Sequence, residues 1–417
     1  MLITSILRVI LTRSFKPFSF EGAFESHLDY ADLKNLGLYV HIPFCHSICS
    51  FCPYCKVLYD RDLAAKYKEA LLSEIKLVGN MNDGKKCVTS LYFGGGTPVL
   101  MLDDLKEIID VIKEYFIIKG GIGVELHPDD INEAVLDVLK SAGVTMVSVG
   151  IQSFNYNCLS VLGRKYRDFT GEMDIVRAAE FDVVDVDLIF AIPWQTSESL
   201  KNDIENAFSH GATQVSTYPF IDFTFADNKY KPMSEKSKKY LLAQITEFAR
   251  ESGKQRTSVW TYSQKGTSKY SSVTRDNFLG FGVSATTLLQ DQFKINTFSI
   301  DAYIDRITND ILPTSLTLHF SQRQRACYYL FWNCYSMQID PKVFEKMIGK
   351  PLAKMYGFEL WVGELFGLLN FEGDVYKLTD KGAYYYHYIE QVYTMKYIDK
   401  MWNISRKQAF PKKITLK

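Results

Sequence analysis

The sequence predicts an α/β fold in which a partial, TIM-like barrel of six strand–helix units, (β/α)6, precedes a small and mostly helical domain. Three observations lead to this prediction. Short β-branched runs alternate with segments of helical apolar spacing from Leu38 to about Phe220, and helical patterns dominate after about Ile300. A chain of 417 residues, 47% of them apolar, is also long enough for a barrel-sized core and a smaller second one.

Six strands are expected in the first region, separated by helical segments such as residues 60–79 and 102–116. The strands read LYVHIP from Leu38, CVTSLYFGGG from Cys87, GIGVELHP from Gly121, TMVSVGIQS from Thr145, VDVDLIFAIP from Val184 and TQVSTYPF from Thr213. This alternation requires parallel pairing through right-handed crossovers, so the carboxyl ends of the strands meet at one rim. The polar and Gly-rich motifs fall at these ends, where the active sites of such barrels lie.

The chain after Phe220 is expected to cover the mouth of the barrel. It contains a polar loop, a helix near residues 237–252 and an irregular Tyr-, Ser- and Lys-rich stretch to Asp276. Further on, LNFEGDVYKLTDKG predicts a hairpin and AYYYHYIEQVYTMKYIDKMW a final helix, in a winged-helix-like arrangement. We therefore divide the chain into an N-terminal arm or short amphipathic helix (1–36), the barrel (37–220), a cover with a second-cofactor segment (221–299) and a helical domain (300–417).

Composition excludes several classes of function. Lys+Arg and Asp+Glu both number 48, so the zero formal charge gives no electrostatic basis for binding nucleic acid. No apolar stretch approaches the roughly 20 residues that span a bilayer. Cys87, Cys158, Cys327 and Cys334 are scattered singly, which argues against a disulfide framework and for a reducing compartment. We expect a cytoplasmic monomer that binds no membrane.

Four cysteines crowd into the stretch YVHIPFCHSICSFCPYCK, Tyr39 to Lys56. Cys45, Cys49 and Cys52 have the spacing C-x3-C-x2-C, and three thiolates from one loop leave a cubane iron–sulfur cluster with one iron that no protein group ligates. That iron is open for chemistry. A zinc site would need a fourth ligand, for which Cys55 and His46 are the local candidates.

The cysteine motif follows the first expected strand, and GGGTP, Gly94 to Pro98, ends the next one. With these motifs the sequence resembles the radical SAM superfamily. The run YVHIPFCHSICSFC, together with LYFGGGTP, VSVGIQSFN, DLIFAIPWQT and GFGVSA, is similar to the oxygen-independent coproporphyrinogen III oxidase family and its class C methyltransferase relatives. The resemblance covers Leu38 to Asn296 and implies a radical SAM barrel, a [4Fe-4S] cluster and S-adenosylmethionine, which the cluster cleaves to a 5'-deoxyadenosyl radical.

The resemblance also implies which residues contact the cofactor on the open iron. The matching positions are Tyr39, Gly95, Gly96, Thr97, Glu125, Gln152, Arg164 and Asp187. In such proteins the backbone of the glycine motif receives the methionyl amino group, acidic side chains suit that group and the ribose hydroxyls, and an arginine suits the carboxylate. Positions that match contacts to a second S-adenosylmethionine are Phe51, Gly96, Gly282, Ser284 and Ala285. Two cofactor molecules are therefore expected.

Cys55 departs from the family pattern. Relatives that oxidise coproporphyrinogen carry a fourth cysteine two residues after the third, whereas CPYC places it three residues after. Only Cys45, Cys49 and Cys52 fit the ligand spacing. We expect Cys55 to be no ligand, and instead a vestige of that position, a packed thiol or a group near the substrate.

Three functions remain open. The first is a radical enzyme that oxidises or modifies a tetrapyrrole, or that methylates or cyclopropanates a carbon of a natural-product intermediate. The second is a haem-binding chaperone of the same fold, and the third a protein with a structural cluster or zinc. The residues Pro53 to Lys56 after the third cysteine disfavour the chaperone, and GFGVSA favours an enzyme. We expect a small-molecule substrate and a reductant such as flavodoxin or ferredoxin, and assign no catalytic residue. Cations that could bind a polycarboxylate at the barrel mouth are Lys229, Lys231, Lys265, Lys269 and Arg275.

Overall fold

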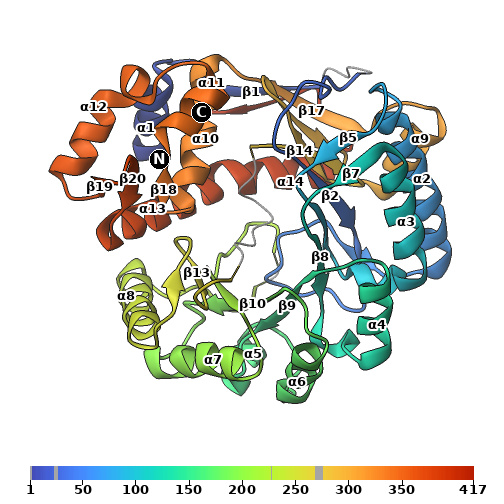
Figure 1. The fold of residues 1–417 in the computed structure, drawn as a ribbon, viewed down its shortest axis with the longest axis horizontal. Coiled ribbons are helices and arrows are strands. Elements are labelled where there is room, and N and C mark those ends of the chain that lie inside the picture. Colours follow the sequence, from blue (N-terminus) through green and yellow to red (C-terminus); the bar gives the residue numbers. More distant parts are fainter. Residues whose placement is uncertain (1, 23–26, 227, 268–275) are drawn as a thin grey trace.

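The fold is that of a computed structural model, which describes residues 2–22, 27–226, 228–267 and 276–417 (Figure 1). Six parallel strands form its centre, in the spatial order β11-β10-β9-β8-β6-β2. Their bounds are β2 Leu36–Ile42, β6 Leu91–Gly95, β8 Ile122–Leu126, β9 Met146–Gln152, β10 Val183–Phe190 and β11 Gln214–Pro219. These are the six predicted strands. They are almost fully buried, which explains why their sequences are mostly apolar.

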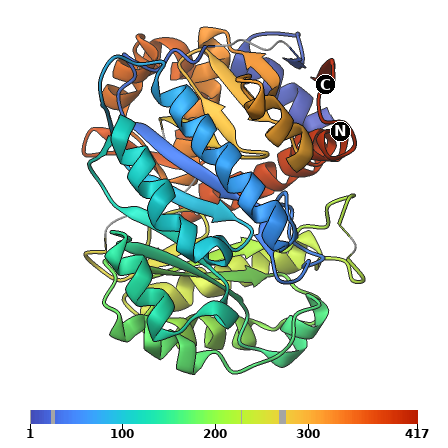
Figure 2. The same cartoon turned by 90° about the vertical axis from the view of Figure 1, so that its right-hand side faces the viewer.

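Helices connect these strands and cover the outer face of the curved sheet (Figures 1 and 2). They are α2 Arg61–Gly79, η1 Pro98–Met101, α3 Leu102–Tyr115, η2 Pro128–Asp130, α4 Glu133–Ser141, α5 Tyr156–Val161, α6 Thr170–Ala178 and α7 Ser197–Ser209. Polar side chains fix where several of them begin. Asp60, for example, accepts the Leu63 N–H at 2.8 Å and so satisfies a free donor of the first turn of α2. Small parallel pairs, β3 Phe44–Cys45 with β4 Val57–Leu58 and β5 Lys86–Val88 with β7 Phe116–Ile118, flank the sheet.

The sheet stays open, as a partial barrel does. Beyond β11 it continues with β13 Thr261–Ser263 and β12 Gln255–Arg256. Beyond β2 it continues with β14 Asn277–Phe281, β15 Thr286–Leu288, β16 Gln292–Asn296, β17 Thr314–His319, β1 Phe18–Glu21 and β21 Lys413–Leu416. The same sheet therefore runs across the predicted boundaries at residues 36, 220 and 299, and the division of the chain into four parts stays a prediction. The helix expected near residues 237–252 is α8 Glu235–Glu251.

Helices dominate the C-terminal region, as expected. They are α9 Ile300–Thr308, α10 Gln322–Tyr335, α11 Pro341–Ile348, α12 Leu352–Leu365, α13 Asp380–Tyr393, the π-helical turn η3 Thr394–Ile398 and α14 Asp399–Lys407. The predicted hairpin is β19 Leu369–Glu372 with β20 Val375–Leu378, extended by β18 Gln338–Ile339. The N-terminal helix α1 Leu2–Thr12 packs against α10 and α13.

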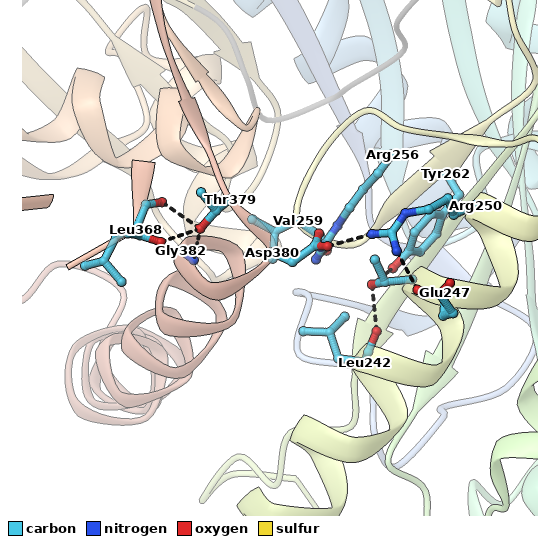
Figure 3. Close-up of polar contacts among 12 residues, drawn as sticks. Leu242, Glu247, Arg250, Arg256, Val259, Tyr262, Leu368, Thr379, Asp380 and Gly382 are labelled. Atoms are coloured by element: carbon cyan, nitrogen blue, oxygen red, sulfur yellow. Dashed lines mark hydrogen bonds and ion pairs between the residues drawn. The ribbon is translucent and has the colours of Figure 1, made fainter. Parts of the chain in front are cut away.

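Ion pairs join the C-terminal region to the barrel at the start of α13 (Figure 3). The Asp380 carboxylate accepts from Arg250 of α8 at 2.7 Å and from Arg256 of β12 at 3.0 Å. Thr379 caps the same helix by accepting the Gly382 N–H at 3.0 Å. Within the described part of the chain, no helix has both the length and the apolar character to cross a membrane.

Candidate cofactor site

The predicted ligands lie on a loop, residues 45–56, that we call the cluster loop. It follows the carboxyl end of β2, and the parallel pair β3–β4 closes its base. The Val57 N–H donates to the Pro43 carbonyl at 2.8 Å, and the Tyr59 N–H donates to the Cys45 carbonyl at 2.9 Å. The two ends of the loop are thus held together while its middle extends to the rim of the sheet.

Cys45, Cys49 and Cys52 are all free and partly buried. Burial, and next the neighbouring Cys52, raise the pKa of Cys45 to about 12, whereas a hydrogen bond from Thr97 opposes this rise. The three thiols and the GGGTP motif are therefore close in space. Among the described residues, no three His, Cys, Asp or Glu side chains are already grouped around one metal position. The donor type fits an iron–sulfur cluster, whose binding would draw these sulfur atoms together and release their protons.

Cys55 has different partners from the other three cysteines. It is 5% exposed, its sulfur donates to the Phe298 carbonyl at 3.4 Å, and the Ser284 hydroxyl bonds to it. Burial raises the pKa of this thiol. These contacts favour the interpretation of Cys55 as a packed thiol, which stays a prediction.

The glycines of GGGTP have a structural role that the sequence did not reveal. Gly95 has φ +113°, and a Cβ there would lie 2.4 Å from the His41 ring; a Cβ on Gly96 would lie 2.4 Å from the Phe44 carbonyl oxygen. The N–H groups of Gly96 and Thr97 donate to the carbonyls of Ile42 and Phe44, both at 2.7 Å. The motif therefore packs against the base of the cluster loop. An ammonium group only donates hydrogen bonds, so on this backbone it would bond to carbonyl oxygens.

Two carboxylates interact beside this motif. Glu125 of β8 accepts from the Tyr92 hydroxyl and from the Gly95 N–H, both at 2.9 Å, and burial raises its pKa. Asp187 of β10 accepts from Ser148 at 2.9 Å. Burial, then repulsion from Asp185 and Glu125, raises the pKa of Asp187 well above its usual range. Donor groups such as an ammonium or ribose hydroxyls would relieve this repulsion.

A histidine that the sequence analysis missed links β2 to the cluster loop. His41 Nε2 bonds to the Cys55 carbonyl at 2.8 Å, and its Nδ1 bonds to the Tyr39 hydroxyl at 2.9 Å. Burial lowers the pKa of His41 to about 4, so the ring is neutral. A carbonyl only accepts, so the single ring proton is on Nε2 and Tyr39 is the donor to Nδ1. Tyr39 also stacks on Tyr92, with ring centroids 6.2 Å apart. One signal in the sequence could have indicated this role: His41 occupies a buried position of the strand that leads into the cysteines.

Arg164 joins the cluster loop to β9. Its guanidinium lies 5.8 Å from the centroid of the Phe51 ring and donates to the Gly150 carbonyl. Within the described residues its Nε is buried without a hydrogen-bond partner, an arrangement that a bound carboxylate would satisfy. Gln152, at the end of β9, has the left-handed φ of +72°. Such backbone strain in a residue other than glycine is concentrated at functional sites.

The GFGVSA segment begins in the last two residues of β14, and Glu74 of α2 hydrogen-bonds to its backbone. This carboxylate is 2% exposed and accepts from the Gly282 N–H at 2.6 Å, the Tyr303 hydroxyl at 2.7 Å and the Asn296 amide at 3.1 Å. A Cβ on Gly282 would lie 2.4 Å from the Tyr67 hydroxyl. These four supporting side chains were not predicted, because each lies far from the motif in the sequence or carries no motif of its own.

The residues expected to contact a second cofactor have different neighbours in and around the cluster loop. Phe51 packs beside Arg164 and against an apolar group that includes Phe220. Ser284, with φ +57°, adjoins Cys55, and the Ala285 N–H donates to the Gly282 carbonyl at 3.3 Å. Gly95, Glu125 and Gln152 lie at or near the carboxyl ends of β6, β8 and β9, whereas Tyr39 and Asp187 lie within β2 and β10 and Arg164 follows α5. Their roles toward a cofactor stay predictions.

The chain is similar to known proteins in sequence and in fold. Residues 39–207 match the model of the Radical SAM superfamily. The chain is 26% identical over 365 residues to the Heme chaperone HemW of Bacillus subtilis, covering 82% of this chain and 95% of that protein. It is 25% identical over 342 residues to the oxygen-independent coproporphyrinogen III oxidase of Synechocystis, covering 75% of this chain and 72% of that protein. The solved structure of coproporphyrinogen III oxidase (HemN) from Escherichia coli superposes with a TM-score of 0.75 at 21% identity, over 93% of this chain and 98% of that one.

Proposed function

We propose, on the premise that residues 39–207 are a radical SAM domain within a HemN-like fold, that this protein is a radical enzyme that modifies a small molecule. Cys45, Cys49 and Cys52 would hold a [4Fe-4S] cluster with S-adenosylmethionine on its open iron. When bound, these groups supply reductive cleavage to a 5'-deoxyadenosyl radical. The observation that carries the proposal is that Cys45, Cys49 and Cys52, all half-buried, lie on one loop whose base packs against GGGTP, with Thr97 bonded to Cys45.

The surrounding residues have distinct tasks in this proposal. The unpaired Nε of Arg164 would bind the methionyl carboxylate, and the carbonyls of GGGTP its ammonium group. Glu125 and Asp187 would accept hydrogen bonds from the ammonium or ribose hydroxyls, which offsets their mutual repulsion. Tyr39, oriented by neutral His41, would border the same space. Together these groups hold the cofactor with charged hydrogen bonds at the rim of the strands.

The cations expected near the barrel mouth do not narrow the substrate class. Lys231 pairs with Asp222 at 2.5 Å, and Lys229 lies 5.2 Å from the centroid of the Tyr230 ring. Lys229, Lys231 and Lys265 are all exposed, while Lys269 and Arg275 lie outside the residues that the structure describes. The described lysines therefore lend no support to a polycarboxylate site. We favour oxidation or modification of a tetrapyrrole, or carbon methylation or cyclopropanation, without choosing between them.

Haem handling is the alternative function, because the similarity to HemW covers most of both chains. The GFGVSA segment favours an enzyme. Its Gly282 is held by Glu74, and its Ser284 contacts Cys55, so an ordered segment lies next to the cluster loop, where it could position a reactant.

The test is anaerobic reconstitution followed by incubation with labelled S-adenosylmethionine, a reductant and candidate substrates. Substrate-dependent release of 5'-deoxyadenosine is the expected result. Haem binding at one equivalent, with a complete cluster and no 5'-deoxyadenosine, would instead establish the chaperone.

The proposed second S-adenosylmethionine has its own readout. If it donates a methyl-derived carbon, each turnover releases both 5'-deoxyadenosine and S-adenosylhomocysteine. If both molecules act only as oxidants, S-adenosylhomocysteine is absent. Equilibrium binding that saturates at one molecule per cluster, with substrate present, would exclude the second site.

A further inference from the structure

The C-terminal helix α14 contacts the cluster loop directly. Figure 1 shows α13 and α14 passing across the middle of the molecule towards β2. Arg406, in the last turn of α14, donates from Nη2 to the carbonyl oxygen of Pro53, the residue after the predicted ligand Cys52. The two residues are 353 positions apart in the chain. The contact therefore joins a helix far along the chain to the loop that carries the predicted metal ligands.

Aromatic rings hold the Arg406 guanidinium in place. Its central carbon lies 4.5 Å from the centroid of the Phe225 ring and 5.6 Å from that of Phe298. Trp402, one turn earlier on α14, lies with its ring centroid 6.1 Å from that of Phe223 and 6.3 Å from that of Tyr54 in the cluster loop. Stacked rings restrict the planar guanidinium to one orientation, so that its donors reach the loop.

The segment after β11 fixes the other end of α14. The Asp399 carboxylate accepts from the Thr224 N–H at 2.7 Å and from the Thr224 hydroxyl at 2.8 Å. Residues 223–225 are thereby bound to the helix at both Asp399 and Trp402. Because α14 is held at two places, Arg406 is presented to the cluster loop by a rigid element.

The Arg406 guanidinium is partly buried, and the described residues do not satisfy all of its hydrogen-bond donors. Its Nε is buried and, among the described residues, has no hydrogen-bond partner. Burial lowers the pKa of Arg406, whereas Cys55 and Cys52 raise it, so both thiols are close enough to interact with its charge. A partly desolvated cation is stabilised by nearby negative charge. Thiolates that ligate a cluster would supply that charge.

We propose that Arg406 is a positioning residue for the predicted cluster. It holds Pro53, and with it the segment that carries Cys52, and its positive charge stabilises the negative charge of the reduced cluster. The part of this inference that concerns the cluster rests on the proposed function. The part that concerns the loop does not.

The first experiment uses the full chain without its cluster. Hydrogen–deuterium exchange with mass spectrometry would follow peptides that span residues 45–58 in Arg406→Gln, Arg406→Lys and the wild type. The matched control is Arg323→Gln, since Arg323 also stacks on an aromatic ring, 4.5 Å from the Tyr356 centroid, and donates to the Leu11 and Met355 carbonyls. We expect exchange in residues 45–58 to rise several-fold in Arg406→Gln, less in Arg406→Lys, and not in the control. Equal exchange in Arg406→Gln and the control would overturn the proposal.

The second experiment measures the midpoint potential of the reconstituted cluster. Loss of the positive charge should lower the potential in Arg406→Gln, while Arg406→Lys should keep most of the wild-type value and Arg323→Gln all of it. An unchanged potential in Arg406→Gln would remove the electrostatic role. If the wild type assembles no cluster, the proposed function fails, and the exchange experiment still decides whether Arg406 holds the loop.

Discussion

Replacement of Glu74 by Gln should remove the contribution of this carboxyl group to the pH dependence of the unfolding free energy. It should also weaken the hydrogen bonds that hold the GFGVSA segment. The carboxylate is buried and accepts three hydrogen bonds, from Gly282, Tyr303 and Asn296. Gln keeps the size of the side chain and one acceptor oxygen, but its NH2 group faces groups that also donate. The substitution therefore removes the charge with little change in volume.

The size of the effect follows from the pKa of Glu74. Burial raises this pKa from 4.5 to about 7, although the three hydrogen bonds act in the opposite direction. Between pH 4.5 and 7 the folded chain keeps a proton that the unfolded chain has released. Stability from this group is thus greatest at low pH and falls as the pH rises through that window. Above it, the charged carboxylate costs the fold about 3 kcal/mol.

Urea unfolding of the cluster-free protein from about pH 5 to about pH 8 measures the contribution of Glu74 to the unfolding free energy. Relative to Glu74→Gln, the wild type should lose about 2–3 kcal/mol of unfolding free energy across the range. The control is Glu247→Gln, which removes an exposed carboxylate that pairs with Arg250 and should follow the wild-type pH dependence. If Glu74→Gln instead follows the wild-type curve, Glu74 does not titrate in this window and the reasoning is wrong.

Three further predictions concern the predicted cofactor site. Cys49→Ala should prevent reconstitution of a [4Fe-4S] cluster while Cys55→Ala retains it, as iron and sulfide analysis would reveal; the opposite pattern would overturn the ligand assignment. Glu125→Ala and Asp187→Ala should keep the cluster and weaken S-adenosylmethionine binding roughly 10- to 150-fold, because a charged hydrogen bond contributes about 1.5 to 3 kcal/mol; unchanged equilibrium binding in both would exclude them from the site. Gly96→Ala should impair cluster assembly itself, since its Cβ would lie 2.4 Å from a carbonyl oxygen at the base of the cluster loop, and a normal iron content would contradict this.

The central strands were predictable because their physical signal is local. A strand buried on both faces is mostly apolar, as in Val183–Phe190, where Asp185 and Asp187 are the exceptions, and this pattern is visible without a partner. The three spaced cysteines are local in the same sense. By contrast, β1 and the edge strand β21 are each four residues long, and nothing in their sequences shows that they pair with each other.

The supporting residues of the site could not be predicted, since their roles depend on contacts across the chain. Glu74 and Gly282 are 208 residues apart, and Arg406 and Pro53 are 353 apart. A lone glutamate in an amphipathic helix, or an arginine near the end of another, is usually a solvated side chain. Only the fold reveals that one is buried against a backbone N–H and the other against a carbonyl.

The pairing of β1 with β21 has a consequence for biosynthesis. Glu21 and Lys413, which form an ion pair across these strands, are 392 residues apart. At about 5–20 residues per second, the ribosome makes the second strand on the order of 20–80 s after the first. During that interval the edge of β1 that pairs with β21 stays unpaired, and Pro53 is likewise made 353 residues before Arg406. The pairing of β1 with β21 and the support of the cluster loop by Arg406 can therefore form only after the six central parallel strands have been made.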